Sequence, residues 1–193
     1  MTAAVFLISM IAIGCLNVAA EETNGFPDWS VVPGLVWGSA SNGIRAGVTD
    51  RDPGVKGVLV LVAFSGSYGW HYVTHPEIRF SKVELRSPEG VEMPPVKNGK
   101  LFGDLPKMIL LKDLPRFPER GTKDRGSTGG FRDWLIGNPS TLSEFDIPDS
   151  YIIEKEGDYR LTVWPVIYEY VPDRLFVSRL DLPYVATTVH LRP

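Results

Sequence analysis

The chain has 193 residues, of which 44% are hydrophobic and 22% are charged, and its formal net charge is -3 at pH 7. This length is sufficient for one domain with a sizeable core. The near balance of charges argues against nucleic acid as a partner, because nucleic-acid binding requires a concentrated positive surface.

The first twenty residues form an apolar stretch without a charged residue, which ends in small residues and is followed by Glu21 and Glu22. Such a stretch is typical of a secretory signal peptide, so we expect cleavage after Ala20 and export to the periplasm, the cell envelope or the extracellular space. Two alternatives stay open. Cys15 lies in a segment that resembles a bacterial lipoprotein box and would be lipidated there, or the apolar run is retained as a membrane anchor.

Cys15 is the only cysteine of the chain. Cleavage after Ala20 removes it, so the exported domain would be stabilised by burial rather than by disulfides. The same loss excludes thiol chemistry and cysteine-ligated metals from the folded part. We expect a signal peptide over 1–20, an extended lead over 21–42 and one β-sandwich domain over 43–193.

Alternating or continuous apolar residues predict strands in the first half of the mature chain. The Asn42-Gly43 turn signal precedes Ile44–Val48, in which apolar residues alternate with other types. Val55–Phe64 contains a continuous β-branched run, which predicts a central strand covered on both faces. Phe80–Arg86 and Lys107–Leu111 predict two further strands.

The alternation becomes clearer after residue 140. The predicted strands there are Phe145–Ile147 with Tyr151–Ile153 as one interrupted strand, Tyr159–Trp164, Ile167–Tyr168, Leu175–Val177 and Val185–Leu191. No segment keeps a helical period for more than about a turn. Many short strands separated by turns predict an all-β fold, a single antiparallel two-sheet sandwich with little helix.

One late segment resembles a known family. Glu156-Gly157-Asp158-Tyr159-Arg160-Leu161 is similar to the corner between two late strands of immunoglobulin-like domains, where a Gly-x-Tyr-x-Cys pattern is typical. The resemblance implies a structural role for Gly157 and Tyr159, with the tyrosine hydroxyl bonded to the backbone a few residues upstream. Leu161 replaces the family's cysteine. The resemblance therefore implies a disulfide-free variant of the immunoglobulin-like sandwiches of exported bacterial proteins.

The strand pattern fails over about 112–142, where we expect one long irregular loop. A mobile, solvated loop is one interpretation of this segment. Its basic residues outnumber its acidic ones. The alternative is an anion-binding loop, in which Arg120 and Arg125 contact the anion.

The densest aromatic feature is the row Tyr68, Trp70 and Tyr72. In an extended strand these side chains share one face, with neighbours about 6–7 Å apart. Such a row can stack on the apolar faces of sugar rings or anchor a protein partner. The alternative is that the row covers one end of the core.

His71 and His75 are the closest pair of histidines, but their surroundings oppose a metal site. Gly69 and Pro76 disfavour a helix there, and in a strand the two rings would lie about 13 Å apart. No serine or carboxylate pattern satisfies a catalytic motif. We therefore expect no metal and no cofactor.

The sequence favours an exported, non-catalytic β-sandwich protein that acts as an envelope or extracellular binding or structural module. Its partner would be a protein or a glycan. The residues expected to contact the partner are Tyr68, Trp70 and Tyr72, followed by Arg120 and Arg125. One alternative is a carbohydrate-binding module that uses the aromatic row. Another is a hydrolase with a site around His71 and His75.

Overall fold

The computed structural model describes residues 34–50, 57–65, 72–75, 78–96, 102–113, 139–171 and 173–193. The strands are β1 (Val36–Trp37), β2 (Ile44–Asp50), β3 (Gly57–Phe64), β4 (Tyr72–Val73), β5 (Phe80–Arg86), β6 (Met108–Leu110), β7 (Ser140–Asp146), β8 (Gly157–Tyr170), β9 (Phe176–Asp181) and β10 (Val185–Leu191). The helical elements among the described residues are the single 3-10 turns η2 (Leu111–Asp113) and η3 (Ile147–Asp149).

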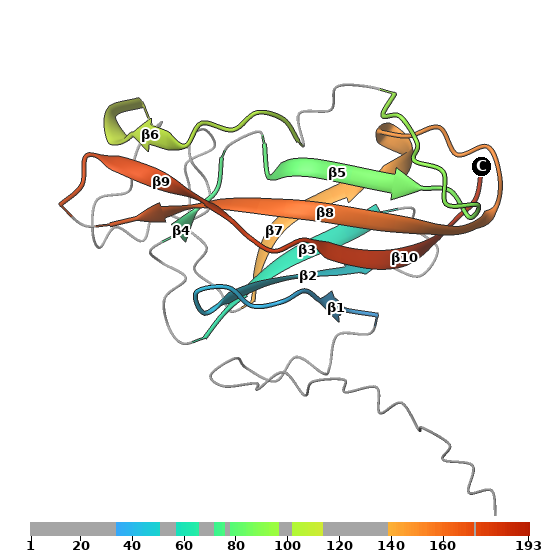
Figure 1. The fold of residues 1–193 in the computed structure, drawn as a ribbon, viewed down its shortest axis with the longest axis horizontal. Helices are drawn as coiled ribbons and strands as arrows, with labels where there is room; N and C mark the ends of the chain where they lie inside the picture. The colour runs from blue at the N-terminus through green and yellow to red at the C-terminus, as the bar shows by residue number, and fades with distance from the viewer. Residues whose placement is uncertain are drawn as a thin grey trace, which may run out of the picture.

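The strands form two antiparallel sheets that pack together as a sandwich (Figure 1). The order in one sheet is β1-β2-β3-β7. In the other sheet β8 is the central strand and runs along the whole molecule. Its first half pairs with β10 and β5, and its second half pairs with β9 and β4, while β6 pairs with β9. The predicted all-β, two-sheet sandwich is confirmed.

The neighbours of β8 change at Pro165. Trp164 pairs with Lys82, and Val163 pairs with Val185, whereas Val166 already pairs with Asp181 of β9. Proline has no N–H group to donate, so a strand that contains it loses a ladder hydrogen bond at that point. The register breaks beside β8 therefore fall where its backbone cannot donate.

The main core lies between the two sheets, where alternate apolar side chains of both meet. β3 is the central strand of its sheet, and all but one of its residues are buried. This confirms the prediction of a central strand that is covered on both faces. In the facing sheet Tyr159, Leu161 and Val163 point into the same core, so their sequence neighbours on β8 point outward.

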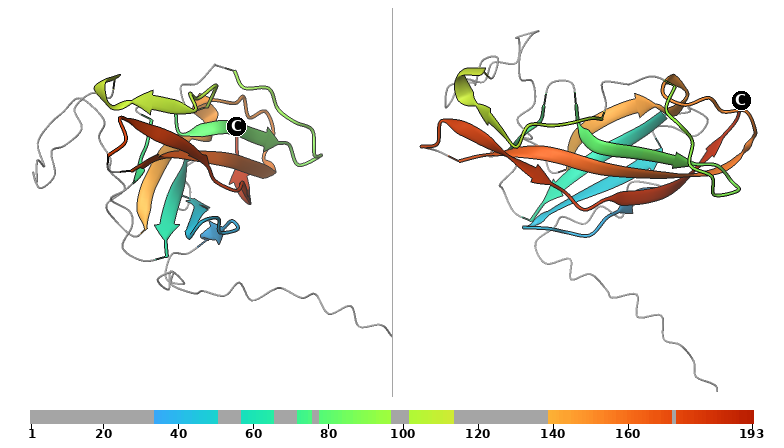
Figure 2. Two further views of the ribbon diagram at one scale, coloured as in Figure 1. Left: turned by 60° about the vertical axis from the view of Figure 1, so that its left-hand side comes forward. Right: turned by 45° about the horizontal axis from the view of Figure 1, so that its top comes forward.

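A second, smaller core covers the outer face of the second half of β8. Val166 and Tyr168 pack there with Leu105 and Val177. The segment over this cluster is held by hydrogen bonds, because the Tyr168 hydroxyl donates to the Pro106 carbonyl oxygen at 2.8 Å. Figure 2 shows β6 and β9 at one end of the molecule, and the outer face of β5, β8 and β10 lies toward the other end.

Several boundaries differ from the sequence-based predictions, of which three bear on the middle and late strands. Tyr151–Ile153 is not a strand, because the turn η3, with Pro148 in it, comes directly before this segment and the backbone N–H groups of Ser150 and Tyr151 both donate to the Ile147 carbonyl oxygen. β8 continues through Ile167–Tyr168, which we expected as a separate strand. β7 begins at Ser140, inside the expected irregular range of 112–142, and residues 114–138 of that range lie outside the described residues.

Candidate ligand-binding face

The candidate site is the outer face of the β5–β8–β10 sheet, which we call the outer face. Successive side chains of a strand point to opposite faces of the sheet. In β5, β8 and β10 one set of side chains fills the main core, so the other set points outward and forms this face. The outward residues are Lys82, Glu84 and Arg86 on β5, Asp158, Arg160, Thr162 and Trp164 on β8, and Ala186, Thr188 and His190 on β10, with Tyr184 directly before β10.

An aromatic pair lies at one end of the outer face. The ring centroids of Trp164 and Tyr184 are 5.9 Å apart, with the planes tilted by 41°. Tyr184 is 57% exposed, and no other aromatic side chain among the described residues is as exposed. Lys82 Nζ lies 5.0 Å from the centroid of the Trp164 ring, within cation–π distance. This end of the face thus combines one open ring, one supporting ring and a cation.

Glu84 fixes the position of Lys82. The lysine Nζ donates to Glu84 Oε2 at 2.7 Å, and Arg86 Nε donates to Glu84 Oε1 from the other side. The hydrogen bond from Lys82 is the main cause that lowers the pKa of Glu84 below its ordinary value of 4.5. The same hydrogen bond raises the pKa of Lys82 above 10.5. Lys82 and Glu84 therefore stay charged at neutral pH, and Glu92 lies beside Arg86 as a second carboxylate of the cluster.

Arg160 adds an uncompensated cation to the middle of the outer face. It is exposed and pairs directly across the strands with Arg86 and with Thr188. Arg86 is bound to Glu84 and to Glu92, whereas Arg160 has no hydrogen-bond or ion-pair partner among the described residues. Two cations that face each other across strands repel, so the position of Arg160 has a cost that no contact within the described fold offsets.

The far end of the outer face contains an exposed ionic network. His190 contacts Asp158 through Nδ1 (2.8 Å) and Glu156 through Nε2 (3.2 Å), and Arg192 donates to Glu156 at 2.9 Å. The hydrogen bonds to Asp158 and then to Glu156 raise the pKa of His190 above its ordinary value of 6.5. Each ring nitrogen of His190 faces a different carboxylate, so His190, Asp158 and Glu156 do not converge on one point. No group of three metal-ligating side chains that could hold an ion occurs among the described residues.

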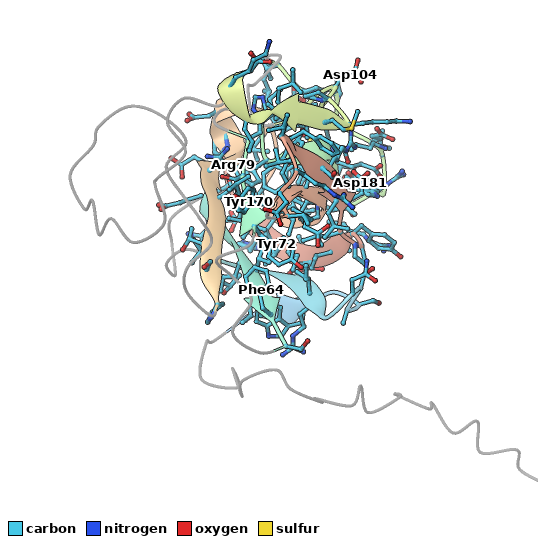
Figure 3. All side chains as sticks on the ribbon, turned by 90° about the vertical axis from the view of Figure 1, so that its left-hand side faces the viewer. Phe64, Tyr72, Arg79, Asp104, Tyr170 and Asp181 are labelled. Atoms are coloured by element: carbon cyan, nitrogen blue, oxygen red, sulfur yellow. The ribbon has the colours of Figure 1, made fainter. Side chains whose placement is uncertain are left out.

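The aromatic row predicted from the sequence is only partly described. Tyr72 is half-buried and stacks on Phe64, with ring centroids 5.2 Å apart and planes inclined by 15° (Figure 3). Burial raises the pKa of its hydroxyl, and the nearby Glu169 raises it further. Tyr72 thus packs against the end of the main core. Tyr68 and Trp70 lie outside the described residues, as do Arg120 and Arg125.

His75, one of the two histidines considered for a hydrolase site, lies far from His190 in the sheet. His75 Nδ1 accepts a hydrogen bond from the backbone N–H of Ile78 at 3.1 Å. His190 pairs with Asp158 at the start of β8, whereas β4 pairs with β8 around Tyr168, about 33 Å further along the strand. His71 lies outside the described residues.

Tyr159 lies at the start of β8, where the chain crosses from one sheet to the other. Its side chain is 2% exposed, and its hydroxyl donates to the Lys155 carbonyl oxygen, four residues upstream, at 2.8 Å. A Cβ at Gly157 would lie 2.6 Å from Pro88 Cγ, so the crossover passes too close to that ring for a larger residue. Cys15 lies outside the described residues.

Sequence reasoning missed Trp164 and Tyr184. Trp164 had a signal, because it falls on the polar side of the alternation that begins at Tyr159, and an outward tryptophan in a strand is unusual. Tyr184 had no comparable local signal. It reaches Trp164 only through the pairing of β10 with β8, which joins segments about twenty residues apart.

Comparison of the chain with family models, with curated proteins and with solved structures finds no match. In the described part of the chain no helix is long and apolar enough to span a membrane.

Proposed function

We propose that this protein is an exported, non-catalytic β-sandwich module that binds its partner in the envelope or outside the cell through the outer face. The observation on which this rests is the Trp164–Tyr184 pair. The Tyr184 ring is 57% exposed and is supported by Trp164 of the central strand β8, which Lys82 also contacts, so the pair gives a preformed contact surface. Tyrosine and tryptophan are enriched at interaction sites, because one side chain offers both apolar area and a polar tip.

The strand order supports an immunoglobulin-like origin for the module. In that fold strands A, B, E and D form one sheet and strands C, F and G form the other. The order β2-β3-β7 corresponds to A-B-E, and β5-β8-β10 corresponds to C-F-G. The Tyr159 hydroxyl bonds upstream at the start of the strand that corresponds to F, as the tyrosine corner of this family does.

Export is supported by the first twenty residues, whose apolar run and small-residue exit are typical of a signal peptide. Mass spectrometry and N-terminal sequencing of the protein from fractionated cells test this part. A chain that begins at Glu21 in the exported fraction supports cleavage, whereas a lipidated Cys15 supports a tethered module. A full-length chain in the cytoplasmic fraction would contradict export.

The binding surface can be tested with a single dye. Thr188→Cys places an environment-sensitive fluorophore on the outer face, and Arg174→Cys places the same fluorophore on the exposed β8–β9 turn, both in a Cys15→Ser background. We expect isolated cell-envelope material to change the emission at position 188 and to leave position 174 unchanged, and we expect Tyr184→Ala to abolish the change. Equal responses at both positions, or a response that survives Tyr184→Ala, would contradict binding through this face.

A further inference from the structure

We infer that the ligand of the outer face is an acidic polysaccharide, a glycan that bears carboxylate or sulfate groups. The inference rests on the proposed function, because it names the ligand class of the same surface. The juxtaposition on which it depends is an open aromatic ring at one end of three paired strands and exposed cations along them, of which Arg160 has no carboxylate partner among the described residues.

The aromatic end offers a stacking surface for one sugar ring. Pyranose rings have apolar C–H faces, which pack on aromatic rings that are flat and accessible. Tyr184 provides the accessible ring, while Trp164 supports it at a centroid distance of 5.9 Å. The position is well defined, because Trp164 lies in the middle of a fourteen-residue strand.

The cations of the outer face favour a ligand that bears anionic groups. Lys82 lies beside the ring pair, and Arg160 lies four residues along β8, about 13 Å from Trp164. Glu84 binds Lys82 and Arg86, and Glu92 also contacts Arg86, so Arg160 is the cation of this row that has no carboxylate partner among the described residues. A sugar stacked at Tyr184 would place the following units of its chain along these cations.

The composition of the outer face favours a glycan over an acidic protein. The buried centre of a stable protein interface is depleted of charge and rich in apolar area. The outer face has charged and hydroxyl side chains around its two rings, and its one aliphatic side chain is the half-buried Ala186. The exposed aliphatic side chains of the described residues, such as Met108, Leu110 and Leu175, lie on other elements.

The test is a titration of the purified protein with polygalacturonate and alginate, and with uncharged pullulan and mannan as neutral polymers, each at low and high salt. The variants are Tyr184→Ala, which removes the open ring, and Arg160→Gln, which removes the cation without breaking a contact in the described fold. Leu175→Ala and Arg174→Gln are matched controls, because both residues are exposed and lie on the β8–β9 turn. Circular dichroism and thermal unfolding verify that each variant is folded.

We expect at least one acidic polymer to bind in low salt and to be released by high salt. Tyr184→Ala should weaken binding about tenfold, Arg160→Gln about threefold, and the two controls not at all. If the neutral polymers bind as tightly as the acidic ones, and if Arg160→Gln does not change the affinity, the acidic ligand is overturned but the binding module is not. If the protein binds an acidic protein but no polysaccharide, and if Tyr184→Ala abolishes that binding, the polysaccharide ligand is likewise overturned and the binding module is not. If no ligand depends on Tyr184, both proposals fail.

Discussion

Glu84 stabilises the sandwich and also positions Lys82 over Trp164, so Glu84→Gln is the most informative single substitution. The carboxylate side chain is 10% exposed and accepts hydrogen bonds from Lys82 and Arg86. Glutamine keeps the shape of the side chain but not its charge. It can accept a hydrogen bond from one neighbour, and it leaves Lys82 and Arg86 as cations on the two outward positions of β5 that flank it.

The expected loss follows from the exposure of the two partners. A hydrogen bond to a charged group contributes about 1.5–3 kcal/mol, but a solvent-exposed ion pair contributes only about 0.2–1 kcal/mol. The side chains of Lys82 and Arg86 are 51% and 41% exposed, so the lower range applies. Two such interactions give a total loss of about 0.4–2 kcal/mol, or roughly 1–8 °C in the midpoint of thermal unfolding.

The pH dependence separates the charge from the shape of Glu84. Its pKa is lower in the folded protein than its ordinary value of 4.5, so its contribution to the free energy of unfolding is fully present above pH 4.5. The contribution is lost as the pH falls through the folded-state pKa and the carboxylate becomes protonated. The difference between the wild-type protein and Glu84→Gln should therefore be largest at neutral pH and shrink toward zero in acid.

Urea denaturation at a series of pH values measures this difference, with tryptophan emission as the signal. Glu154→Gln is the matched control, because Glu154 is exposed and has no partner among the described residues. We expect that variant to be as stable as the wild-type protein. The reasoning is refuted if Glu84→Gln equals the wild-type protein at pH 7, or if its deficit at pH 7 persists unchanged into acid.

Three further predictions concern other parts of the sandwich. His190 should titrate above 6.5 in a proton NMR experiment and return toward that value in Asp158→Asn; the stabilisation from its charged form is present at low pH and disappears as the pH rises through the raised pKa. Gly47→Ala should cost about 1–3 kcal/mol and change tryptophan emission, because the new Cβ would lie 2.6 Å from the Trp37 ring; unchanged emission would contradict this. Tyr151→Phe should cost about 1–3 kcal/mol in urea denaturation, since it leaves a buried β5 carbonyl oxygen unpaired, and a neutral effect would show that water replaces the hydroxyl.

Local sequence signals were sufficient for much of the fold. The Asn42-Gly43 pair has φ values of 52° and 72°, which the left-handed region allows for these residue types, and the turn directly precedes β2. Phe80–Arg86 and Val185–Leu191 match β5 and β10, because each has one face against the core and one face toward water. Period-two alternation reports such half-buried strands directly.

The errors occurred where long-range packing overrides local pattern. Tyr151 has the sequence pattern of a strand residue, but it is buried directly after a turn. Its hydroxyl donates a hydrogen bond to the carbonyl oxygen of Val83, which is 68 positions away in sequence. β8 continues past Pro165, where a proline normally ends a central strand, because the backbone N–H of Val166 donates to Arg79 and the pairing resumes with new neighbours. Single-sequence patterns contain no information about such partners.

The candidate site is built around Trp164 on a central strand. We therefore expect some substitutions at the site to affect mainly binding and others to affect mainly stability. A site on a regular strand is more precise than one on a loop, since the backbone of the strand is fixed by two neighbours. Trp164 has β5 on one side and the start of β10 on the other. Tyr184 lies just outside this array and is mostly exposed, so its removal should affect binding far more than folding. Glu84 is the opposite case, because it is nearly buried and bonded on both sides. Its substitution should reduce stability, and should reduce binding only as far as Lys82 leaves the Trp164 ring.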